Sequence, residues 1–128
     1  MIIENAIATL NSKFVYTADK HLLRDNWTII KDFSSDKVYG DCEDYSLTLL
    51  WLISKNKTEF WRKLRYDYSL YFVKLRSGEG HIVLYSKDRD QYIDNITKKF
   101  VNRDELIKRG YKFKFKAPLW FIWIKLKI

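Results

Sequence analysis

The residue with the clearest chemical potential in this sequence is its only cysteine, Cys42, two positions after Gly40 at the expected start of a helix. Backbone N–H groups and the positive end of the helix dipole stabilise a thiolate there and lower the pKa of the thiol. This placement favours a nucleophile, whereas a thiol at an arbitrary position is more often a buried structural residue. One cysteine closes no intramolecular disulfide, and with two histidines it is too few for an ordinary structural zinc site.

A cysteine nucleophile needs a base, and the chain has two histidines. His21 stands in a polar segment, where we expect it to face solvent. His81 follows a Gly-Glu-Gly turn and opens an apolar strand, which places its imidazole at the rim of a sheet that the cysteine helix can reach. A histidine hydrogen-bonded at a strand end is the alternative for His81.

The base needs an acceptor that orients it, and the expected strand register supplies Asp94. Residues 81–86 and 91–96 form a predicted hairpin in which paired residue numbers sum to 177. Asp94 then faces Val83 and lies diagonal to His81 on the same face of the sheet. Because an acid in an apolar strand needs a polar partner, we expect Asp94 to contact His81.

The elements that position these residues predict an α+β fold of one domain, residues 1–128. Helices are expected over residues 2–14, from the cap at Asp41 to residue 53, and over 59–64. The second is apolar nearly all round in residues 45–53 and is therefore expected to be central and buried. Strands are expected over residues 69–76, 81–86, 91–96, 111–116 and 119–127, with a short helix between Asn102 and Gly110. The central helix, which carries the cysteine, packs on an antiparallel sheet that carries the histidine and the aspartate.

Three short motifs resemble those of the bacterial transglutaminase-like cysteine proteinases, a family that includes the LapG-type proteases that clip surface adhesins. The sequence GDCEDY at residues 40–45 resembles the nucleophile motif, HIVL at 81–84 the histidine strand, and IDN at 93–95 the acid motif. The resemblance implies a papain-like, transglutaminase-like fold, with Cys42 as nucleophile, His81 as general base and acid, and Asp94 as the orienting residue. It also places the oxyanion at the backbone N–H of Cys42, with Trp27 or Asn26 as second donor.

Three acids, Asp41, Glu43 and Asp44, crowd Cys42. Asp41 is expected to cap the helix, with Asp44 as the second member of a capping box. Their negative charge raises the pKa of the thiol and opposes the helix dipole. In the LapG-type relatives such acids bind calcium, which implies a Ca²⁺ site here. Because three carboxylates are too few for a full calcium shell, we favour the capping role and expect no required cofactor.

The charge balance, 24 Lys and Arg against 16 Asp and Glu, suits an acidic substrate or a nucleic acid. Basic and aromatic residues alternate in residues 61–66 and 111–116, as in single-strand binders, although a half-buried strand with Tyr111, Phe113 and Phe115 inward also explains the second stretch. No signal-peptide pattern opens the chain, and the longest uncharged apolar run, residues 117–124, is too short to span a bilayer. We expect a cytoplasmic protein of bacterial or phage type, acting in the host cytoplasm if it is a phage product.

The sequence therefore predicts a thiol hydrolase, foremost a cysteine protease, that cleaves a protein or peptide through a thioester at Cys42 and uses water activated at His81. An amidase or a transglutaminase would use the same triad and the same acyl-enzyme. The alternative from another class is a non-catalytic protein of the same fold that binds nucleic acid or an acidic partner through its basic surface.

Overall fold

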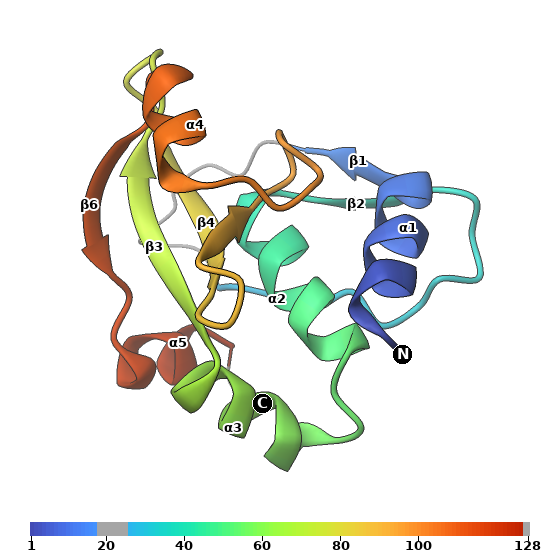
Figure 1. Ribbon diagram of the computed structural model, residues 1–128. Coiled ribbons are helices and arrows are strands. Elements are labelled where there is room, and N and C mark those ends of the chain that lie inside the picture. The colour runs from blue at the N-terminus through green and yellow to red at the C-terminus, as the bar shows by residue number, and fades with distance from the viewer. Residues whose placement is uncertain (18–25, 127–128) are drawn as a thin grey trace.

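The computed structural model describes residues 1–17 and 26–126 (Figure 1). The elements in this part of the chain are α1 (Ile3–Lys13), β1 (Phe14–Tyr16), β2 (Val38–Gly40), α2 (Cys42–Leu52), α3 (Lys57–Tyr66), β3 (Tyr68–Lys74), β4 (Gly80–Ser86), β5 (Gln91–Ile93), α4 (Arg103–Lys108), β6 (Lys112–Lys116) and α5 (Leu119–Leu126). Four strands form an antiparallel sheet in the order β5-β4-β3-β6, and β1 pairs with β2 in parallel. The predicted α+β class is confirmed.

Helix α2 lies between the four-stranded sheet and α1 (Figure 1), and it contacts β4 on one side and α1 on the other. Every residue from Cys42 to Leu50 is buried, as its apolar pattern predicted. Leu47, Leu49 and Leu50 are completely inaccessible to solvent. Burial of each such leucine stabilises the fold by about 1.5–3 kcal/mol, so α2 is firmly held in the core.

The β4–β5 hairpin has the predicted register, with Leu84 opposite Ile93 and Tyr85 opposite Tyr92. The expected strand over residues 91–96 is nevertheless too long, because β5 ends at Ile93. The Asp94 carboxylate accepts hydrogen bonds from the backbone N–H groups of Ile96 and Thr97. These bonds replace the strand ladder with a tight turn.

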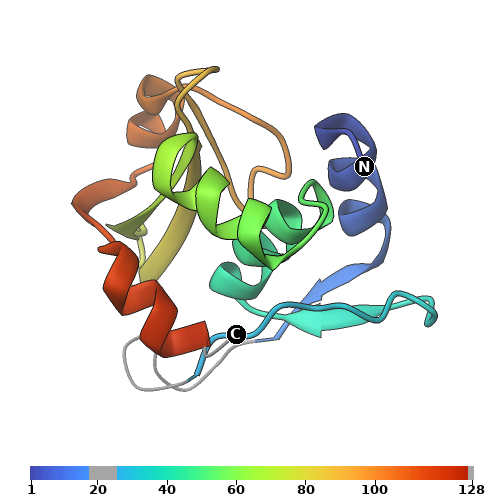
Figure 2. The same cartoon turned by 90° about the horizontal axis from the view of Figure 1, so that it is seen from below.

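The predicted strand over residues 119–127 is wrong, because the chain forms helix α5 there. The carbonyl of Pro118 accepts hydrogen bonds from the N–H groups of Phe121 and Ile122, which begins the helix. Residues 119–124 are apolar at every position, so this part of the run carries neither a strand period nor a helix period. Packing decides between them, because Phe121 contacts Trp27 and Phe72. Figure 2 shows α5 on the outside of the molecule, at the opposite end from α1.

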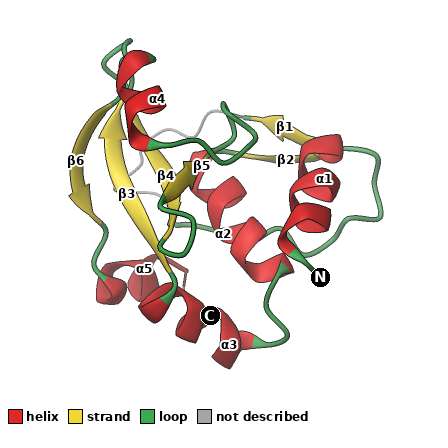
Figure 3. Cartoon of the chain, viewed as in Figure 1, coloured by secondary structure: helices red, strands yellow, loops and turns green. Residues whose placement is uncertain are grey.

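A second, smaller apolar cluster joins Leu106 of α4 to Val73 and Val83 of the sheet. Figure 3 shows α4 beside the upper end of β3. Gly110, at a φ of 94°, ends α4 and turns the chain toward β6. Tyr111 follows directly and is buried in this cluster. A bulge opposite Phe72 and Val73 then shifts the β6 register. Phe115 consequently packs on the Phe72 ring yet remains 55% exposed, so the expectation that it faces inward is wrong.

Candidate active site

The candidate nucleophile is the first residue of α2, where β2 leads into the helix. Asp41 is the N-cap and forms the predicted capping box with Asp44. The close approach of the two elements requires glycine at position 40, because a Cβ there would lie 2.9 Å from Asp44 Cβ. The backbone N–H of Cys42 therefore stands at a helix N-terminus, where N–H groups have no partner within the helix.

The predicted contact between His81 and Asp94 is present. The Nε2 atom of His81 lies 2.8 Å from Asp94 Oδ2, and both side chains are buried. The Tyr111 hydroxyl donates to the same carboxylate oxygen at 2.6 Å. The other oxygen, Oδ1, accepts from Ile96 N at 2.9 Å and Thr97 N at 2.7 Å. Both oxygens of this buried carboxylate are thus satisfied.

These contacts keep Asp94 ionised. Burial raises the pKa of Asp94, but the hydrogen bond and charge of His81, together with the donors of Thr97 and Tyr111, hold it below its usual value. An ionised Asp94 accepts a hydrogen bond from Nε2–H of His81. The neutral imidazole then carries its lone pair on Nδ1, the atom that can take a proton.

Sequence reasoning missed the role of Tyr111, which it treated only as an inward-facing strand residue. Its hydroxyl reaches Asp94 from 17 positions away in sequence, and its ring meets the His81 ring edge to face at 5.8 Å. No local sequence pattern predicts this contact, because it forms only when α4 docks on the sheet.

The thiol of Cys42 lies beside β4, where the backbone N–H of Ile82 interacts with the sulfur. Ile82 directly follows His81 in β4. The backbone group that meets the thiol and the residue that carries the imidazole are therefore consecutive in one strand. The thiol, however, donates to Glu43 Oε2 at 3.3 Å. Within the described part of the chain no hydrogen bond joins the thiol to the His81 imidazole.

The expectation of a lowered thiol pKa is wrong for this arrangement. Cys42 is 5% exposed, and this burial raises the pKa of the thiol. The charge of Glu43, the hydrogen bond to it and the charge of Asp41 raise the pKa further. The thiol is therefore protonated in this state, because burial, together with the neighbouring acids, outweighs the effect of the helix N-terminus.

The three acids form a compact, buried group, with one oxygen from each of Asp41, Glu43 and Asp44 within 4.8 Å of the others. Asp44 accepts hydrogen bonds from the backbone N–H and hydroxyl of Thr28. Glu43 Oε1 is buried and accepts no hydrogen bond from any described residue. Burial also raises the pKa of Glu43. Carboxylate oxygens suit a hard divalent cation, so this group could hold a metal.

One further residue near the cysteine was not singled out from the sequence. Tyr16, at the end of β1, is 50% exposed and pairs with Gly40 in the β1–β2 register. Burial raises the pKa of Tyr16. An exposed tyrosine is thus paired with the glycine that stands two positions before Cys42.

The expectation of Trp27 as an oxyanion donor is wrong for its backbone. The N–H of Trp27 donates to the Lys125 carbonyl at 3.1 Å, and its ring is buried against Phe72 and Phe121. Asn26 is exposed, and its role as a donor stays a prediction. His21 lies outside the described residues.

Comparison with protein-family models, with curated proteins and with solved structures gives no match for this chain. The chemistry of the site rests on its own geometry.

Proposed function

We propose that this chain is a thiol hydrolase, foremost a cysteine protease, of papain-like, transglutaminase-like fold. Cys42 is the nucleophile, His81 the general base and acid, and Asp94 the orienting residue. The observation that carries the proposal is the buried 2.8 Å contact between His81 Nε2 and Asp94 Oδ2, one residue from the Ile82 N–H that meets the thiol. A buried imidazole–carboxylate pair beside a cysteine at a helix N-terminus supports proton transfer to and from sulfur.

In the proposed reaction the thiol turns from Glu43 to the imidazole, and Nδ1 of His81 takes its proton. The sulfur attacks the substrate carbonyl carbon, and the backbone N–H of Cys42 donates to the resulting oxyanion. The protonated imidazole gives its proton to the leaving amine, and a thioester forms. Water, deprotonated by His81, then releases the acid and restores the thiol. With an amine in place of water the same steps give transglutamination, and the net charge of +8 favours an acidic peptide substrate.

The protonated thiol, hydrogen-bonded to Glu43, represents a resting state. The proposed reaction therefore needs a change in the surroundings of Cys42 that lowers the pKa of the thiol. Calcium at Asp41, Glu43 and Asp44 is the cation suggested by the resemblance to LapG-type proteases, and it would supply positive charge that lowers the pKa of the thiol. The buried, unpartnered Oε1 of Glu43 supports a cation there. Calorimetric titration with CaCl₂ tests the site: we expect heat of binding in the wild type and its loss in Glu43→Gln. Equal binding by both proteins contradicts it.

The catalytic proposal is tested with a peptide library and a thiol-directed electrophile, with and without Ca²⁺. We expect cleavage at defined positions and labelling of Cys42 in the wild type. Cleavage should fall at least about 10³-fold in His81→Ala and in Cys42→Ser, with unchanged circular dichroism. An unlabelled wild type that cleaves nothing under either condition overturns the proposal. Cleavage that survives Cys42→Ser overturns it as well.

One observation favours a second candidate, a non-catalytic binding protein. The thiol is buried, and its pKa is raised by that burial and by Glu43. A binding protein would engage nucleic acid or an acidic partner through exposed lysines, with affinity that falls steeply as salt is added. Such binding should be indifferent to Cys42→Ala and should produce no turnover.

A further inference from the structure

Helix α5 is apolar at every position except Lys125, yet only one of its faces is covered. Phe121, Ile122 and Leu126 pack toward the core. Trp120 and Trp123 are 64% and 60% exposed, and Ile124 is 51% exposed. An apolar helix of this kind is normally enclosed on every side. Its outer face is therefore an uncovered apolar surface, on which four large exposed side chains lie close together in the sequence.

The exposed side chains form one continuous stripe. Residues 120, 123 and 124 are related by three and four positions, so they share one face of the helix. Leu119, four positions before Trp123, widens the stripe and is also exposed. The stripe lies on a helix at the outside of the molecule (Figure 2), so it projects from the surface. We call Leu119, Trp120, Trp123 and Ile124 the α5 stripe.

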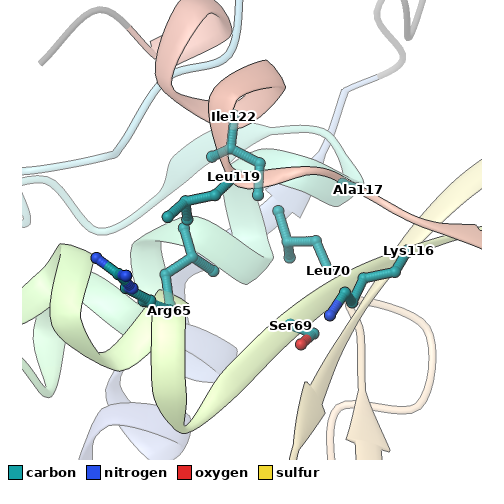
Figure 4. A pocket seen from close by; sticks show the side chains of 8 residues that line it. Arg65, Ser69, Leu70, Lys116, Ala117, Leu119 and Ile122 are labelled. Atoms are coloured by element: carbon teal, nitrogen blue, oxygen red, sulfur yellow. The ribbon is translucent and has the colours of Figure 1, made fainter.

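Positive charge borders this stripe. Arg65 and Lys116 lie on opposite sides of a pocket of about 110 Å³, with Leu70, Leu119 and Ile122 between them (Figure 4). Both cations are exposed, and within the described residues neither forms an ion pair. Every charged residue from Lys108 to the end of the sequence is basic. The stripe is thus bordered by exposed cations, and the chain segment that carries it contains no acidic side chain.

We propose that the α5 stripe docks this protein on a membrane surface that contains anionic lipid. Tryptophan is enriched at the boundary between headgroups and acyl chains, and isoleucine and leucine gain from insertion there. Arg65 and Lys116 then meet the lipid phosphates and carboxylates, each basic residue near the surface contributing about 1 kcal/mol. The eight residues of α5 are far fewer than a span requires, and no helix among the described residues is long and apolar enough to cross a bilayer.

Charge argues against the other occupants of this face. Pairing of two copies through α5 would bring Arg65 and Lys116 of each copy toward those of the other, and like charges oppose such a contact. A nucleic acid would use the two indole rings for stacking but would gain nothing from the exposed Leu119 and Ile124. An anionic membrane uses both the aliphatic and the basic residues.

The test is co-sedimentation with phosphatidylcholine vesicles, with and without phosphatidylserine. We expect binding to the vesicles with phosphatidylserine, at least tenfold weaker binding to phosphatidylcholine alone, and weakening by added salt. The double variant Trp120→Ala/Trp123→Ala should lose binding at least tenfold, and Lys116→Glu should lose it several-fold. Ile107→Ala, at a similarly exposed apolar position on α4, and Lys57→Glu, at an exposed position of α3, are the matched controls and should bind as the wild type does.

Three results overturn the proposal. The first is no vesicle binding, or binding that the double tryptophan variant retains. The second is a dimer in analytical ultracentrifugation that this variant dissociates, which identifies a second copy as the occupant. The third is binding of an oligothymidylate, but not of vesicles, that depends on the tryptophans. Because Trp120 and Trp123 are separate from the triad, Cys42→Ala should bind vesicles normally, so failure here leaves the catalytic proposal standing.

Discussion

The two halves of the candidate site differ in how completely their polar groups are hydrogen-bonded. On the sheet side, Asp94 receives hydrogen bonds at both oxygens, and His81 is oriented by one of them. On the helix side, the Cys42 thiol is bonded to Glu43, whose second oxygen is buried without a partner among the described residues. One half is fully hydrogen-bonded, whereas the other leaves a buried carboxyl oxygen without a partner among the described residues.

This difference teaches which half limits reactivity. Backbone N–H groups and the Tyr111 hydroxyl fix the Asp94 carboxylate, and this carboxylate holds the imidazole in one tautomer. These groups are already in place, so no free energy is spent on arranging them when the reaction begins. The helix side instead favours the protonated thiol, because burial and the two neighbouring acids disfavour a negative charge on the sulfur. Local violations of polar satisfaction concentrate at functional sites. Under the proposed function, the acid–base half would be ready, and the nucleophile half would need activation.

The largest expected effect breaks the complete half. Asp94→Asn removes the negative charge to which His81 and Tyr111 hydrogen-bond. The free energy of unfolding should therefore fall by about 1.5–3 kcal/mol at neutral pH. The folded-state pKa of Asp94 is lowered, so its contribution is present above its unfolded value of about 3.9 and is lost as pH falls through the folded value. The gap between wild type and variant should therefore shrink below about pH 4. Urea unfolding across this range measures it.

Asp36→Asn, at an exposed position, is the control for Asp94→Asn and should change stability by less than about 0.5 kcal/mol. A gap between wild type and Asp94→Asn that stays constant into acid would contradict the assigned ionisation of Asp94.

The next effect repairs the incomplete half. Glu43→Gln removes the negative charge nearest the thiol, so the pKa of Cys42 should fall. Alkylation by iodoacetamide at neutral pH, with chelator present, should accelerate about tenfold, the equivalent of one pKa unit. Glu4→Gln, at an exposed position on α1, should react as the wild type does. An unaccelerated Glu43→Gln would show that burial alone silences the thiol.

The smallest effect sharpens the comparison within the complete half. Tyr111→Phe deletes one donor to Asp94 and should cost about 0.5–1.5 kcal/mol of stability. With one fewer donor, the pKa of Asp94 should rise, so acid unfolding should begin at higher pH and the acid limb of the activity profile should shift the same way. Tyr66→Phe, at an exposed position, should leave both unchanged. A stability loss without any shift in pH dependence would make Tyr111 a packing residue only.

The local half of the architecture follows from the sequence alone. The capping box of Asp41 and Asp44 begins α2 at Cys42 because a cap depends on residues three positions apart. The hairpin register brings Asp94 to His81 because a short turn determines which residues pair. The burial of α2 follows from its apolar pattern.

The tertiary structure decided two kinds of feature. One is the contacts between residues that are distant in sequence, and the other is the conformation of a segment that has no hydrophobic period. Helix α5 formed where a strand was predicted, because the apolar run 119–124 has no hydrophobic period and its conformation is decided by the residues it packs against. Tyr111 reached Asp94, and Glu43 was buried against the thiol, only once α4 and α2 had docked on the sheet. The sequence by itself therefore determined which groups could react and how their elements begin. The docked fold decided their ionisation, because burial and neighbouring charges exist only after the layers come together.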